Sequence, residues 1–185
     1  MGFTHGKHGF HPRETCPPQQ TPAGLNTTPS KTFGSNVMST YTQIYYPLVW
    51  SVKGRIPALP ESHRDHLCRY AAGILKNMDC HPYWINGTED HVHFLTSLHP
   101  SVPLADMVRE VKRGTGKWMK ASGSFPLFDH WQDGYGGFTV SHGNRDVVQE
   151  YIKNQIQHHR EEDYLTELKS LLEKAGIAYD AKYLD

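Results

Sequence analysis

The chain has 185 residues, of which 37% are hydrophobic and 11% aromatic, and its 19 Lys and Arg balance its 19 Asp and Glu. This length is enough for one domain with a real core. The zero net charge excludes a basic-tail type of nucleic-acid binder but leaves room for a local basic face. No apolar run approaches the ~20 residues that a membrane span needs.

The three cysteines, Cys16, Cys68 and Cys80, form no Cys-x-x-Cys pair. Nothing at the start of the chain resembles a secretory signal peptide. We therefore expect reduced thiols in a cytoplasmic protein, with Cys68 as a buried small hydrophobe.

The first 37 residues differ from the rest in composition. They are rich in Gly, Pro, Thr and His and show no periodic apolar pattern. Segments of this kind cannot bury enough apolar surface to fold. We expect residues 1–37 to be a disordered N-terminal tail and residues 38–185 to form a single folded domain.

The apolar pattern of residues 38–185 then alternates between strand-like and helix-like spacing. In chain order it predicts a strand at 40–53, a helix at 60–77, strands at 80–86 and 90–98, a helix at 103–121, a strand at 138–142, a helix after Asn144, and a last amphipathic helix at 162–175. The dipeptide Asn86-Gly87 is a hairpin turn signal between the second and third strands.

The order β-α-β-β-α-β followed by helices is typical of the ferredoxin-like, or split βαβ, plan. We therefore predict an α+β fold, in which an antiparallel sheet carries helices on one face and is followed by a further C-terminal helix.

The third predicted strand contains the sequence His91-Val92-His93. Residues i and i+2 of a strand project from the same face, so both imidazoles can reach one cation while Val92 faces the core. Alone, the pair is weak evidence in a chain with 13 histidines. Asp90 could orient a histidine ligand or could simply be a turn residue.

Tyr151 and Gln155 lie four residues apart and therefore share one face of the third predicted helix. A tyrosine can act as a covalent nucleophile, and a glutamine carbonyl can bind a hard cation. The alternative, which spacing alone favours, is that Tyr151 packs on the core and Gln155 is solvated.

The helix at 103–121 carries a row of basic side chains. Such a row is usually a solvated helix face, but it would also suit contact with DNA phosphates. The candidate DNA-binding residues are Arg109, Lys112, Arg113, Lys117 and Lys120.

Taken together, "EDHVHFL" and, about sixty residues later, "EYIKNQIQHH" resemble the single-tyrosine HUH transposases, the TnpA type of insertion sequences and their REP-associated relatives. The resemblance covers about Met38 to Asp185 and includes "INGTEDHVHFL", "WQDGYGGFTVS" and "LLEKAGIAYDAKYL".

This resemblance implies that His91 and His93 are ligands of a Mg²⁺ or Mn²⁺ ion, that Gln155 is the third ligand, and that Tyr151 is the nucleophile. It also implies a single-stranded DNA substrate with hairpins, a 5′-phosphotyrosine intermediate, and a homodimer whose tyrosine helix completes the partner's site.

Other classes remain open from the residues themselves. One is a non-catalytic, degenerate single-stranded nucleic-acid-binding module on the same fold. A second is a small domain built around a structural metal, although that would require four closed ligands, usually with cysteines. A third is an HUH relaxase or replication initiator, which usually carries additional domains.

Overall fold

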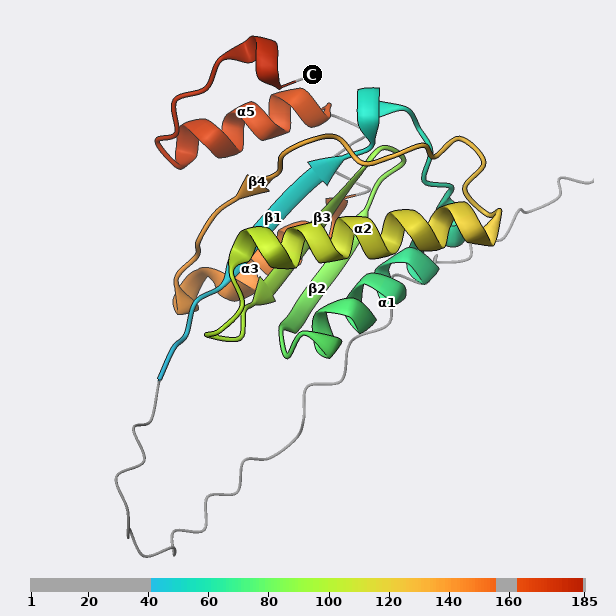
Figure 1. Ribbon diagram of the computed structural model, residues 1–185. Coiled ribbons are helices and arrows are strands. Elements are labelled where there is room, and N and C mark those ends of the chain that lie inside the picture. Colours follow the sequence, from blue (N-terminus) through green and yellow to red (C-terminus); the bar gives the residue numbers. More distant parts are fainter. Residues whose placement is uncertain (1–40, 156–162, 185) are drawn as a thin grey trace, which may run out of the picture.

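The computed structural model describes residues 41–155 and 163–184, so the tail predicted at 1–37 lies outside the described residues. Its centre is a four-stranded antiparallel sheet with the order β2-β3-β1-β4 (Figure 1). The strands are β1 Tyr46–Ser51, β2 His81–Gly87, β3 His91–Ser97 and the short β4 Gly136–Gly137.

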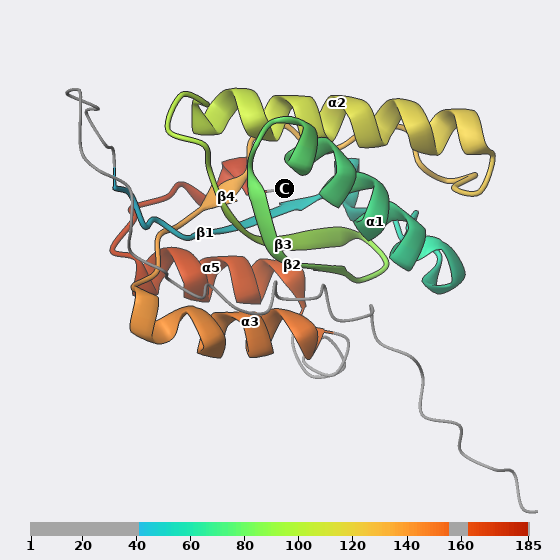
Figure 2. The ribbon, with the colours of Figure 1, turned by 90° about the horizontal axis from the view of Figure 1, so that it is seen from below.

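Helices cover both faces of this sheet. Figure 2 shows α1 and α2 on one side, and α3 and α5 on the other. The helices are α1 Glu61–Asn77, α2 Leu104–Ser122, α3 Arg145–Lys153 and α5 Tyr164–Lys174, and the short 3₁₀ turns are Lys53–Arg55, His142–Asn144 and Ala181–Tyr183. No helix in the described part of the chain is long and apolar enough to cross a membrane.

The main core lies between the sheet and the layer formed by α1 and α2. Leu48, Trp50 and Val52 point into it from β1, and the Trp50 ring stacks on Phe94 of β3 with centroids 4.4 Å apart. The side chains of Cys68 and Cys80 are both buried, as expected for Cys68. Because strand residues alternate between faces, the residues between these core positions face α3 and α5.

The predicted α+β fold and element order are confirmed, but two local predictions are wrong. The last strand is predicted at 138–142, but β4 lies at Gly136–Gly137. The predicted range contains one isolated bridge, between Val140 and Tyr45. A Cβ on Gly136 would lie 2.8 Å from Cγ1 of Val49. A glycine is therefore needed where the chain approaches β1, and apolar spacing gives no hint of this.

The hairpin turn also lies later than predicted. Asn86 and Gly87 belong to β2, where Asn86 pairs with His93, and the turn follows with a bond from the amide of Thr88 to the carbonyl of His91 (3.0 Å). The consequence is functional, because Asn86 is placed on the same face as the histidines.

Candidate active site

His91 and His93 project together from β3, on the face opposite the main core. Val92 between them belongs to that core, and both imidazoles are almost completely buried. Their ring centroids lie 5.1 Å apart. The predicted shared face is therefore present, and it is covered rather than open.

The ring of His91 is oriented by the turn before β3. Its Nδ1 lies 2.8 Å from the hydroxyl of Thr88 and 2.6 Å from a carboxylate oxygen of Asp90. Nδ1 protonation is favoured by such an acceptor, which leaves Nε2 to face the interior of the site.

Helix α3 brings the predicted tyrosine and glutamine to the same place. Tyr151 lies beside His93, with ring centroids 6.4 Å apart, and Gln155 is fully buried just beyond the end of the helix. Asn86 fixes this end to the sheet, since its amide nitrogen donates to the carbonyls of Ile152 (2.9 Å) and Lys153 (3.2 Å). A helix at its C-terminus has free carbonyls for such a donor.

A buried carboxylate that sequence reasoning missed connects all four residues. Oε1 of Glu167, on α5, accepts hydrogen bonds from the hydroxyl of Tyr151 and from Nε2 of Gln155 (3.0 Å). Its Oε2 lies 3.4 Å from Nε2 of His93 and 3.7 Å from Nε2 of His91. A signal existed, because Glu167 falls on the apolar stripe of its helix, beside the buried Tyr164 and Leu168.

The donor set fits a divalent cation. One ligand atom from each of His91, His93 and Glu167 lies within 4.8 Å of the others. Within the described ranges, Nε2 of His93 and Oε1 of Gln155 are buried atoms without a hydrogen-bond partner. Buried polar atoms are normally satisfied, and two imidazoles with a carboxylate and an amide oxygen suit a first-row or hard divalent ion.

A second tyrosine of α5 borders this cluster. The ring of Tyr164 lies 4.7 Å from that of His91. Burial raises the pKa of the Tyr164 hydroxyl to about 12, against a smaller opposing effect of its hydrogen bond with Ser51. Tyr164 therefore stays protonated and is a poorer nucleophile than an ordinary tyrosine.

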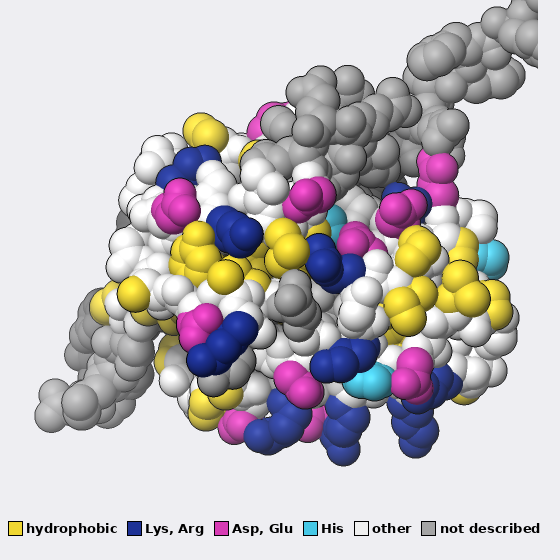
Figure 3. Space-filling model, turned by 90° about the horizontal axis from the view of Figure 1, so that it is seen from above, with side chains coloured by type: hydrophobic (Ala, Val, Ile, Leu, Met, Phe, Trp, Pro, Cys, Tyr) yellow, Lys and Arg dark blue, Asp and Glu magenta, His cyan; other side chains and the backbone are white. Residues whose placement is uncertain are grey.

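The predicted basic residues do not all share one environment. Arg109, Arg113 and Lys120 are exposed and pair with Asp106 (2.9 Å), Glu110 (2.5 Å) and Asp129 (3.1 Å), and Lys117 is also exposed. Figure 3 shows Lys and Arg side chains along one edge of the molecule with Asp and Glu between them.

Lys112 points away from the other basic residues and towards the loop before β4. Its ammonium group donates to the carbonyls of Gln132 (2.8 Å) and Gly134, and burial lowers its pKa to about 8. It therefore holds the loop before β4.

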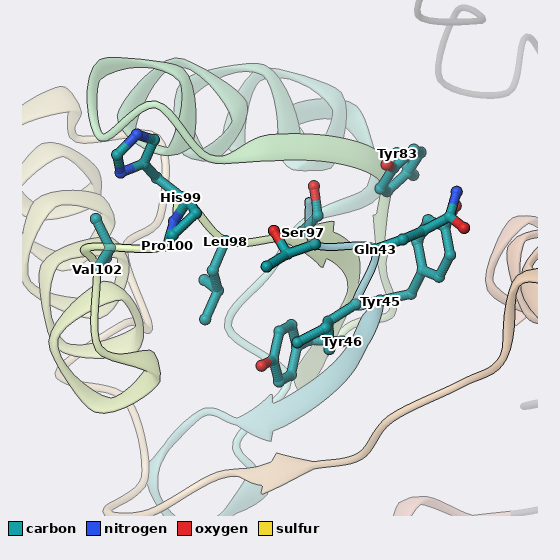
Figure 4. Close-up of a pocket in the computed structure, with 11 residues that line it drawn as sticks. Gln43, Tyr45, Tyr46, Tyr83, Ser97, Leu98, His99, Pro100 and Val102 are labelled. Carbon is teal, nitrogen blue, oxygen red and sulfur yellow. The ribbon is translucent and has the colours of Figure 1, made fainter. Parts of the chain in front are cut away.

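A pocket of about 350 Å³ lies away from this cluster, at the start of β1 and the end of β3. Figure 4 shows Tyr45, Tyr83, Ser97 and His99 among the residues around it. His91 is at the other end of β3, so this pocket does not contain the candidate chemistry.

Comparisons with known proteins show which family this chain belongs to. A family model described as an IS200-like transposase matches residues 40–155. The ISDra2 transposase TnpA of Deinococcus radiodurans is 28% identical over 120 residues, which cover 61% of this chain and 84% of the relative.

Two solved structures share the fold. One, assigned as a transposase from Deinococcus radiodurans R1, has a TM-score of 0.51 and 24% identity, covering 66% of this chain and 98% of its own. The other, a REP-associated tyrosine transposase bound to a REP hairpin, has a TM-score of 0.50 and 16% identity, covering 66% of this chain and 74% of its own. The family model spans most of the described chain and includes both histidines, Tyr151 and Gln155, so the chain belongs to the IS200-like transposase family.

Proposed function

We propose that this protein is a DNA transposase that cleaves and rejoins single-stranded DNA at hairpin-flanked ends through a 5′-phosphotyrosine intermediate. One observation carries the proposal. The hydroxyl of Tyr151 meets Glu167 in a buried cluster with His91, His93 and Gln155. A module that only binds nucleic acid has no need for a tyrosine hydroxyl beside a buried set of metal ligands.

His91, His93 and Gln155, together with the carboxylate of Glu167, would hold Mg²⁺ or Mn²⁺. When bound, such an ion polarises a non-bridging oxygen of the scissile phosphate and neutralises its charge. The protein supplies the rest. Thr88 and Asp90 orient His91, and Asn86 holds α3 so that Tyr151 stays beside His93.

The chemical step transfers the phosphoryl group from the 3′ oxygen of the DNA to the oxygen of Tyr151. One phosphodiester bond replaces another, so no external energy source is needed. Attack by the oxygen of Tyr151 forms a Tyr–O–P bond and breaks the bond from phosphorus to the 3′ oxygen. The phenol proton ends on the leaving 3′ oxygen, which gives a 5′-phosphotyrosine and a free 3′-OH. A 3′-OH of another strand end reverses the step and joins the DNA. A free phenol is only about 0.1% ionised at neutral pH, so the hydroxyl of Tyr151 requires a polarising environment.

The proposal extends to partners and location. The exposed row of Arg109, Arg113, Lys117 and Lys120 would contact DNA phosphates, since its exposed ion pairs are weak and can exchange. We also propose a cytoplasmic homodimer in which the tyrosine helix completes the partner's site. The single chain places Tyr151 beside its own His93, so the proposed dimer would form the same contact between the two chains by exchanging this helix.

The test uses randomised single strands attached to a constant hairpin, with a 5′ or 3′ label and Mn²⁺. We expect a labelled protein adduct that disappears in EDTA and in Tyr151→Phe, while the variant still retains DNA. An undiminished adduct in Tyr151→Phe would eliminate the nucleophile, and an adduct in excess EDTA would eliminate the metal. DNA binding without any adduct in the wild type would instead support the degenerate binding module.

Mixing two inactive variants tests assembly in trans. Tyr151→Phe retains the metal site, and His91→Ala retains the tyrosine. If the mixture forms an adduct that neither variant forms alone, the site is completed by the partner. If the mixture stays inactive, each chain uses its own tyrosine.

A further inference from the structure

A second pocket lies directly beside the candidate active site. Its volume is about 220 Å³, and it lies between β1, the loop before β4, and α5. Among the residues that line it are Ser51, Gln132, Asp133, Tyr135, Tyr164 and Leu168. Tyr164 is shared between this pocket and the cluster, since its ring lies 4.7 Å from that of His91.

The loop that forms the outer wall is held away from the edge of β1. Before the loop, the amide of Gln132 donates to the carbonyl of Ser51 (2.9 Å), and after it Gly136 pairs with Val49. Residues 133–135 therefore bulge outward opposite Trp50. Gly134 adopts a φ of 74°, a conformation that glycine tolerates best.

Lys112 of α2 braces this bulge from inside. Its ammonium group donates to the carbonyls of Gln132 and Gly134 and lies 5.5 Å from the centre of the Trp50 ring. The bulge is therefore a built feature, and its sequence belongs to the segment "WQDGYGG", to which the proposed chemistry assigns no role.

The lining suits a flat, partly apolar ligand better than a phosphate. Tyr135 and Tyr164 supply aromatic rings, Leu168 supplies an apolar surface, and Asp133 supplies a carboxylate that repels anions. The positive charge of Lys112 faces the loop carbonyls. Nucleobases stack on aromatic rings, and a carboxylate accepts hydrogen bonds from the exocyclic amino groups of cytosine and adenine.

We propose that this pocket holds the base of a nucleotide next to the scissile phosphate, with a preference for bases that carry an amino group over thymine. The inference rests on the DNA-cleaving function proposed above and adds a specificity site to it. Only the ring of Tyr164 separates the pocket from His91. A DNA strand whose phosphate lies at the histidines would therefore bring a neighbouring base to the bulge.

The first test measures base binding without cleavage. Deoxynucleoside monophosphates are titrated calorimetrically into the full chain in EDTA, so that no metal can hold the phosphate. We expect dAMP and dCMP to bind about tenfold more tightly than deoxyribose 5-phosphate, and Tyr135→Ala to lose about tenfold in affinity.

Tyr70→Ala is the matched control, because Tyr70 on α1 is 39% exposed and Tyr135 is 38% exposed. Equal nucleotide affinity in the two variants would overturn the proposal. Equal affinity of the wild type for the nucleotides and the sugar phosphate would do the same.

The second test measures which bases flank the cleaved bond. Randomised single strands captured as the protein adduct are sequenced, and we expect depletion of thymine at one position flanking the cleaved bond. Asp133→Asn should weaken that depletion, which would appear as a larger share of thymine at that position among the captured strands. Cleavage with no base preference at the flanking positions would refute the specificity site and leave the cleavage function intact. Nucleotide binding through Tyr135 without any adduct would refute the cleavage function and, with it, the placement of this base next to a scissile phosphate.

Discussion

The hydroxyl of Tyr151 donates a hydrogen bond to the carboxylate of Glu167, and this contact joins two helices over the histidines of β3. The same carboxylate accepts from Gln155 and lies within 3.7 Å of both His91 and His93. Glu167 is thus the common neighbour of the two histidines, the tyrosine and the glutamine.

Replacement of Glu167 by Gln should weaken metal binding. The variant keeps the shape of the side chain but removes the only carboxylate among the clustered ligands in the described residues. We expect the affinity for Mn²⁺ to fall about tenfold or more, measured by calorimetry or by the electron paramagnetic resonance signal of free Mn²⁺. Glu173→Gln, on an exposed turn of the same helix, is the control. Equal affinity in the two variants would remove Glu167 from the metal site.

Asn86→Asp should release the tyrosine helix. The change is isosteric, but it removes the donor to the carbonyls of Ile152 and Lys153 and places an acceptor opposite them. We expect a loss of about 1–3 kcal/mol in the free energy of unfolding. We also expect the rate of adduct formation to fall more than DNA affinity does.

Urea unfolding and single-turnover kinetics measure these two effects. Asn77→Asp, at the exposed end of α1, is the control for the change in charge. A rate and stability equal to those of the control would show that Asn86 does not position α3.

The candidate active site contains residues that the sequence predicts and others, Asn86 and Glu167, that it does not. The apolar pattern predicts the strand of His91 and His93 and the helix of Tyr151 and Gln155, and the period of each element places both members of a pair on one face. In the structure the two pairs lie together around Glu167. The metal and nucleophile roles of these residues remain proposals.

Asn86 and Glu167 could not be found in the same way. Asn86 reads as a turn residue beside Gly87, and only the register of β2 against β3 places it opposite His93. Glu167 is twelve residues beyond Gln155, and its role depends on how α5 packs against the sheet. Long-range packing of this kind gives only a weak sequence signal. For Glu167 the signal is a carboxylate among the apolar residues of one helix face.

Lys112 gives a prediction about pH. Burial lowers its pKa to about 8 in the folded chain, below the ordinary value of 10.5. Between these two values the unfolded chain binds more protons than the folded chain, so stability should rise with pH across this window.

Lys112→Met should lack this rise. The difference between wild type and variant should grow by about 1–2 kcal/mol from pH 8 to pH 10.5, allowing for the screening of a side chain that still contacts water. Urea unfolding at each pH measures it, with the exposed Lys117→Met as control. A difference that does not change with pH would mean that the ammonium group is not held in a desolvated position.

The location of the DNA on the protein tests the central claim most directly. The wild-type adduct formed with Mn²⁺ is digested with nuclease and trypsin, and the peptide that carries the remaining nucleotide is sequenced by mass spectrometry. The account predicts a 5′-nucleotide on the oxygen of Tyr151 and no adduct in the EDTA control. A nucleotide on Tyr164 or any other residue would contradict it.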